Sequence, residues 1–156
     1  MATATKELRP DGKLRLPPGQ HLTTGWPVLH YGSIPRIDLA SWKLHAWGLV
    51  DEEKTFTWDE FNALGSTKEV NDIHCVTTWS KYDNEWEGIP FAAVMDQLKI
   101  APEAKYVMLH CYGGYTTNVP LVDLMKPDVM FAHSHNGQPL WTEHGWPCLL
   151  YTSRCV

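Results

Sequence analysis

The stretch Asp72-Ile73-His74-Cys75-Val76-Thr77-Thr78-Trp79-Ser80 places a single thiol at the end of an apolar segment. Residues 68–76 alternate as in a strand, so that His74 and Cys75 point to opposite faces. Polar residues follow the apolar segment directly, and residues 80–85 are expected to form a loop. We therefore expect Cys75 near the carboxyl end of a strand.

Two short helices are expected on either side of this stretch. Thr57 is followed three residues later by Glu60, which is the pattern of a capping box, and Gly65 ends the helix that begins there. The apolar residues between Phe91 and Leu98 recur at helical spacing, which predicts the second helix.

Strand patterns outnumber helix patterns. Prolines exclude helix from residues 16–32 and predict an extended segment laid over a surface. Asn136-Gly137 is a strong hairpin signal. The sequence therefore predicts an α+β protein with a β-rich mixed sheet or barrel-like core. The expected strands are residues 42–50, 68–76, 105–112 and 128–133.

Composition limits the functional classes. A chain of 156 residues that is 44% hydrophobic suits one domain, and a net charge of −5 argues against nucleic acid or an anionic membrane as the main partner. No apolar run approaches the roughly 18 residues of a membrane helix. The expected location is the cytoplasm. Residues 1–13 lack an apolar period and are expected to be a disordered N-terminal segment.

Cysteines and histidines form several candidate constellations. The four cysteines contain no CxxC pair, so reduced thiols are expected. Four pieces could share one cleft, namely His30, His74-Cys75, His110-Cys111 and His144. Their spacing does not match a zinc finger or ribbon. Taken alone, a cysteine in an apolar strand is more often a buried inert thiol. Of Cys75 and Cys111, we expect Cys111 to be the core residue.

Residues 113–118 read Gly-Gly-Tyr-Thr-Thr-Asn. The two glycines give a ligand close access to the backbone, and the polar side chains suit an anionic ligand that accepts hydrogen bonds. A plain turn is the alternative. His133 and His135 are interpreted as exposed histidines at a hairpin and are given no role.

Seven blocks occur in an order that is typical of one enzyme family. They resemble the sulfite oxidase-like, molybdopterin-dependent oxidoreductases over residues 14–147, and in particular the short cytosolic bacterial branch. The blocks are Gly48-Leu49-Val50, Phe56-Thr-Trp-Asp-Glu-Phe61, Asp72-Ile-His-Cys-Val-Thr77, Trp86-Glu-Gly-Ile-Pro-Phe91, Gly113-Gly-Tyr-Thr-Thr-Asn-Val-Pro-Leu121, Asn136-Gly-Gln-Pro-Leu140 and Glu143-His-Gly-Trp-Pro147.

The resemblance implies a molybdenum centre held by one pterin dithiolene and by one protein thiolate, Cys75, which is also the catalytic residue. It implies that the molybdopterin cofactor lies along His30, along residues 116–118 and against His144. Residues 116–118 are Thr116, Thr117 and Asn118. The implied reaction is two-electron oxygen-atom transfer on a small sulfur-containing or other X=O substrate, with an unidentified electron-transfer partner.

The sequence also departs from the family pattern. An arginine usually follows the His-Gly-x-Pro block, whereas Cys148 and Leu149 stand here. The family continues beyond the position of Val156 with lysines that hold the pterin phosphate. Residues 148–153 resemble a translated sequencing adaptor. We therefore expect an incomplete domain over residues 14–147, without its last strands, and a non-native tail over residues 148–156.

Around Cys75 the basic residues that bind sulfite have no clear counterpart, since Thr78 and Lys81 stand there. Sulfite itself is not implied. Two other functions fit parts of the sequence. The eight tryptophans would suit a non-catalytic ligand-binding domain, and the histidines and cysteines would suit a zinc protein.

Overall fold

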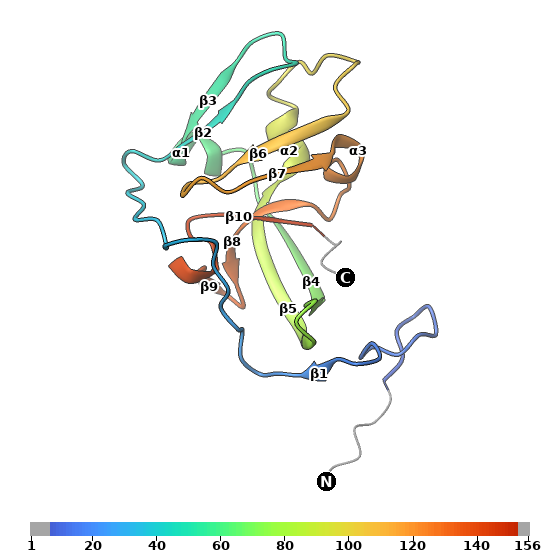
Figure 1. Ribbon diagram of the computed structural model, residues 1–156. Helices are drawn as coiled ribbons and strands as arrows, with labels where there is room; N and C mark the ends of the chain where they lie inside the picture. The colour runs from blue at the N-terminus through green and yellow to red at the C-terminus, as the bar shows by residue number, and fades with distance from the viewer. Residues whose placement is uncertain (1–6, 153–156) are drawn as a thin grey trace.

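A computed structural model describes residues 7–152, and strands dominate it (Figure 1). The helices are short and the sheet is mixed, so the predicted β-rich α+β class is confirmed. The strands are β1 His21–Leu22, β2 Lys43–Ala46, β3 Lys54–Thr57, β4 Thr67–His74, β5 Trp79–Pro90, β6 Tyr106–His110, β7 Thr116–Pro120, β8 Met130–His135, β9 Gln138–Pro139 and β10 Leu149–Tyr151. The helices are α1 Trp58–Asn62, α2 Phe91–Met95, α3 Leu121–Leu124 and the 3-10 helix η1 Thr142–His144.

A six-stranded mixed sheet organises the molecule. Its longest pairing is the antiparallel β4–β5 hairpin, and β5 continues to β8 and then β10. Strand β1 adds to β5 in parallel. The β2–β3 and β6–β7 pairs form two separate two-stranded sheets. These pairs lie at one end of the molecule, while the β4–β5 tip and β1 lie at the other (Figure 1).

The expected loop at residues 80–85 is wrong, because these residues form part of β5. Asn84 is fully buried, and its side-chain amide donates to the carbonyl oxygens of Asn71 and Lys81 over 3.2 and 2.7 Å. Buried polar groups are tolerated when they are hydrogen-bonded in this way. The polar composition of residues 80–85 therefore suggested a loop, although these residues form a strand that pairs with β4.

The local helix signals are confirmed. Thr57 caps α1, with Glu60 closing the capping box, and α2 begins at Phe91. Most expected strands are present but shorter or shifted by a few residues. Strands β3, β7 and β10 and helix α3 were not predicted.

Close packing at one glycine fixes how β5 meets β8. A Cβ atom placed on Gly88 would lie 2.2 Å from the carbonyl oxygen of Phe131. The register between the strands shifts at Glu87 and Gly88, which lets the backbones approach. Trp86, two residues earlier, is 1% exposed and belongs to the core.

The predicted division at residues 1–13, 14–147 and 148–156 stays a prediction. Of the first segment, residues 7–13 are described, and Leu8 bridges to Leu14. Of the last segment, residues 149–151 pair with β8, and Tyr151 is 5% exposed. Residues 1–6 and 153–156 lie outside the described part. Among residues 7–152, no helix has the length and apolar character to cross a bilayer.

Candidate functional site

Cys75 begins a tight turn directly after β4. Its N–H donates to the Trp79 carbonyl over 2.9 Å, and its carbonyl accepts from the Thr78 N–H over 3.0 Å. Thr78 has φ +76°, which is unfavourable for a β-branched residue. Strained backbone of this kind concentrates at functional sites. The Cys75 thiol is half-buried and lies 3.1 Å from the Thr77 hydroxyl.

An extended segment, residues 20–31, joins this turn to other predicted site residues; we call it the strap. At one end, Gln20 donates through Nε2 to the Cys75 carbonyl over 2.9 Å. In its middle, Trp26 stacks on His144, with ring centroids 3.8 Å apart. At the other end, the Tyr31 ring lies 5.6 Å from that of Tyr115. The strap thus contacts three parts of the candidate site.

His144 lies in η1 beneath the Trp26 ring. Burial lowers its pKa, and the nearby His30 lowers it further, while Glu143 opposes the shift. A neutral imidazole presents one donor and one acceptor to a ligand. A shared cleft for His30 and His144 stays a prediction.

Residues 116–118 lie elsewhere. They belong to β7, which pairs with β6, so the plain turn suggested for them is replaced by a strand. Thr116 and Asn118 are exposed on one face, whereas Thr117 is half-buried on the other. The contacts described for Cys75 are with its own turn and with Gln20. The structure does not bring residues 116–118 into contact with Cys75.

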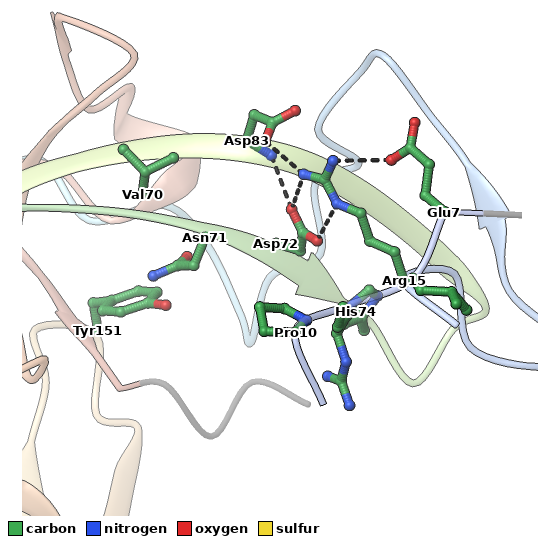
Figure 2. A pocket seen from close by; sticks show the side chains of 11 residues that line it. Glu7, Pro10, Arg15, Val70, Asn71, Asp72, His74, Asp83 and Tyr151 are labelled. Atoms are coloured by element: carbon green, nitrogen blue, oxygen red, sulfur yellow. Dashed lines mark hydrogen bonds and ion pairs between the residues drawn. The ribbon is translucent and has the colours of Figure 1, made fainter. Parts of the chain in front are cut away.

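A cavity of about 680 Å³ lies beside β4, and His74 lines it (Figure 2). Arg15 crosses this cavity and donates to the two carboxylate oxygens of Asp72 over 2.7 and 2.8 Å. Figure 2 shows the same guanidinium reaching Asp83 and Glu7. The cavity therefore contains an ion-pair network next to the Cys75 turn.

Hydrogen bonds stabilise the charged form of Asp72 in this network. Burial by itself would raise the pKa of Asp72, but the Arg15 guanidinium and the Asp83 N–H outweigh burial and lower it. Burial also lowers the pKa of His74, so its neutral form is favoured. Next to Cys75, the neutral form of His74 is thus favoured. Asp72, two residues before His74, is a carboxylate paired with Arg15.

Two expectations about other residues are wrong. Cys111 is exposed, because β6 ends at His110 and the strand alternation stops before the cysteine. His133 and His135, expected to be exposed, are both half-buried, and His135 Nε2 lies 2.9 Å from the Asn84 side-chain oxygen. Burial, with the nearby Lys81 and His144, lowers the pKa of His135 to about 4.

Sequence reasoning missed Gln20 and Trp26. The prolines before and after them predicted the extended path, which is confirmed, but no local pattern indicates which distant residue each side chain meets. Both contacts depend on how β1 and η1 pack in the folded chain.

Comparisons with known proteins identify the family of this chain. The sequence model described as "Oxidoreductase molybdopterin binding domain" matches residues 31–155. The uncharacterized oxidoreductase YuiH of Bacillus subtilis (strain 168) is 41% identical over 91% of this chain and 72% of its own length. Nitrate reductase [NADH] 1 of Oryza sativa subsp. japonica is 23% identical over 83% of this chain and 18% of its own length.

A solved structure has the same fold. The sulfane dehydrogenase SoxCD from Paracoccus pantotrophus aligns with 80% of this chain and 37% of its own chain, with a TM-score of 0.71 and 20% identity. At this identity the match describes the fold alone. The chain therefore corresponds to only part of the larger proteins that it resembles.

Proposed function

The chain belongs to the oxidoreductase molybdopterin binding domain family, whose cofactor is molybdopterin, and we propose that it is a molybdenum-dependent enzyme with Cys75 as the protein ligand. The observation that carries the proposal is the position of Cys75, a half-buried thiol in a strained turn at the end of β4. Thiolate is a soft ligand that suits this kind of metal centre.

The residues present fit this cofactor. No group of three or more metal-binding side chains occurs among residues 7–152. A site built from protein ligands alone needs such a group, whereas a metal carried by the dithiolene of a cofactor needs one thiolate. Cys75 supplies that thiolate from the hydrogen-bonded turn after β4. Just before β7, a Cβ placed on Gly113 or Gly114 would meet no atom within 4 Å, so a ligand has room to approach the backbone.

We assign the remaining cofactor contacts to His30, His144 and residues 116–118. His144, held beneath Trp26, offers a neutral imidazole to the pterin. Thr116 and Asn118 offer exposed hydroxyl and amide groups from β7. Thr117, on the half-buried face, would act by packing. When bound, the cofactor supplies two-electron oxygen-atom transfer.

We propose a small sulfur-containing or other X=O compound as the substrate, and a separate electron-transfer partner. The names of the similar proteins support this range. SoxCD is a sulfane dehydrogenase, and the plant protein is a nitrate reductase. Oxidation or reduction of such a substrate at a centre that exchanges two electrons requires a partner that returns or removes them.

A non-catalytic, tryptophan-rich binding domain is the second candidate. Trp47 and Trp141 favour it, because their side chains are 50% and 66% exposed and open to a planar ligand. This function predicts no metal, and ligand-dependent tryptophan fluorescence that persists in Cys75→Ser.

Metal analysis separates the two candidates. The 156-residue chain is expressed in a host that makes molybdopterin, and molybdenum and pterin are measured per chain. We expect about one of each in the unaltered protein, because there is one thiolate ligand. Cys75→Ser loses the molybdenum, while Cys111→Ser, which removes an exposed thiol but keeps the backbone bonds of the Gly113-Gly114 turn, retains it. Equal molybdenum in Cys75→Ser and the unaltered chain would refute the assignment.

A further inference from the structure

The carbonyl group of Cys75 receives two hydrogen bonds from two different segments of the chain. One comes from the Thr78 N–H within the turn, over 3.0 Å, and the other from Gln20 Nε2 on the strap, over 2.9 Å. The peptide group that follows Cys75 is therefore held by one hydrogen bond from within the turn and by one from the strap. This matters because Thr78 has φ +76°, a conformation that persists only when its surroundings enforce it.

The strap reaches the turn through its backbone as well. His21 N–H donates to the Thr78 carbonyl, and Thr23 N–H donates to the Ser80 carbonyl, each over 2.9 Å. These bonds belong to the parallel pairing of β1 with β5. They place the side chain of Gln20, one residue before β1, against the Cys75 peptide.

The orientation of the Gln20 amide follows from its two partners. Its NH₂ group donates to the Cys75 carbonyl, so its oxygen Oε1 faces the Ser80 hydroxyl, 3.2 Å away. The reverse orientation would set two oxygen acceptors against each other at Cys75. Ser80 therefore donates its single hydroxyl proton to Gln20.

This assignment determines the tautomer of His74. Ser80 is fully buried, and its hydroxyl oxygen lies 2.8 Å from His74 Nδ1. Since the hydroxyl proton is directed to Gln20, the hydrogen between His74 and Ser80 must sit on Nδ1. Nε2 of the neutral ring is then an acceptor. A continuous chain of hydrogen bonds runs from His74 through Ser80 and Gln20 to the Cys75 carbonyl.

We infer that Gln20 is a positioning residue for the Cys75 thiolate, acting through the Cys75 carbonyl and through the hydrogen-bond chain that it forms with Ser80 and His74. This role rests on the proposed function of Cys75 as the molybdenum ligand. Gln20 touches neither the thiol nor the metal in this account. It fixes the turn from which the thiol projects.

Nuclear magnetic resonance of the cofactor-free 156-residue chain tests the contacts directly. In the unaltered protein, long-range ¹H–¹⁵N spectra should show His74 with its proton on Nδ1. Gln20→Met removes both ends of the amide at similar volume. It should move the Cys75 carbonyl ¹³C resonance upfield, and it should free the Ser80 proton so that His74 changes to the Nε2–H tautomer.

Gln20→Glu separates the two halves of the contact. A carboxylate still accepts from Ser80, so His74 should keep its proton on Nδ1, but it cannot donate to Cys75, so the carbonyl resonance should still move. Thr23→Ala is the control on the same strap. Its hydroxyl accepts the local Gly25 N–H, and its loss should change neither signal.

Molybdenum retention connects these contacts to the ligand. From a molybdopterin-producing host, Gln20→Met should lose molybdenum about fivefold faster than Thr23→Ala, the factor expected for one neutral hydrogen bond. An Nε2–H tautomer of His74 in the unaltered chain would overturn the inference without any variant. Unaltered chain that carries molybdenum, with unchanged signals in both Gln20 variants, would overturn the role of Gln20 alone. Unaltered chain without molybdenum would overturn the proposed function.

Discussion

The indole of Trp26 lies parallel to the imidazole of His144, with ring centroids 3.8 Å apart and planes 6° apart. Trp26 also meets the His135 ring at 4.6 Å and the Trp86 ring edge-on at 5.4 Å. One aromatic side chain of the strap therefore packs against η1, β8 and β5 together. The strap that contacts the Cys75 turn through Gln20 also covers a residue proposed to bind the pterin.

Replacing Trp26 by alanine should expose His144. Because burial is the main cause of its lowered pKa, the pKa should rise toward the ordinary value of 6.5. The variant should also lose about 0.5–1.5 kcal/mol of stability beyond the loss of buried area, as is typical of aromatic pairs. The titration is followed by the His144 ring resonances. Trp47→Ala, which removes a tryptophan stacked on His45 instead, is the control. An unchanged His144 titration in Trp26→Ala would contradict the contact.

Local signals in the sequence predicted part of the fold. The Thr57 and Glu60 capping box depends on residues three apart, and the alternation of residues 68–76 located β4 within two residues. Strand β5 was missed because its polar residue Asn84 is satisfied by partners such as Asn71 on another strand. Local pattern cannot reveal such partners.

The residues of the candidate site were likewise predicted only in part from the sequence. Cys75 was identified from its sequence block, and the structure places it at the end of β4 as expected. Gln20 was missed, since 55 residues separate it from Cys75 and no periodicity links them. The proposed roles of His30, His144 and residues 116–118 come from the family resemblance, because no local pattern distinguishes them from ordinary loop and strand residues.

The ion pair between Arg15 and Asp72 should make the free energy of unfolding depend on pH. The pKa of Asp72 is below its ordinary value of 3.8, so the folded state favours the carboxylate. The resulting stabilisation is complete above that ordinary value and is lost as the pH falls through the lower, folded-state pKa.

Asp72→Asn should therefore cost about 1.5–3 kcal/mol at pH 7, the range for hydrogen bonds to charged groups, and much less at pH 2. Urea denaturation at both pH values measures the difference. The control is Asp11→Asn, because Asp11 is 48% exposed and its ion pair with Arg9 lies at the surface. A cost that is equal at the two pH values would refute the prediction.

Gly88 should tolerate no side chain. Its added Cβ would lie 2.2 Å from the Phe131 carbonyl oxygen, so Gly88→Ala must push β5 and β8 apart. We expect a loss of roughly 1–3 kcal/mol, the usual cost of overpacking. Gly25→Ala is the matched control, because its nearest contact is an ordinary 3.7 Å from the Thr23 hydroxyl. Thermal melts of equal midpoint for the two variants would show that the close approach is absent.

His135 should destabilise the protein in mild acid. Its pKa is about 4 in the folded chain and about 6.5 when unfolded, so the unfolded state binds more protons between these values. The stabilisation that the neutral His135 ring contributes is complete above pH 6.5 and decreases as the pH falls toward 4. His135→Gln should show a smaller decrease over this interval in urea denaturation. An identical slope in the variant would mean that other groups cause the acid sensitivity.

The central claim is that Cys75 is the one protein ligand of molybdenum, and X-ray absorption at the molybdenum edge tests it most directly. One dithiolene and one cysteine thiolate predict about three sulfur neighbours in the loaded protein. Molybdenum reconstituted into Cys75→Ser at high cofactor concentration should show about two, with an added oxygen or nitrogen neighbour. An unchanged sulfur count in Cys75→Ser would show that the thiolate comes from elsewhere and would contradict the account.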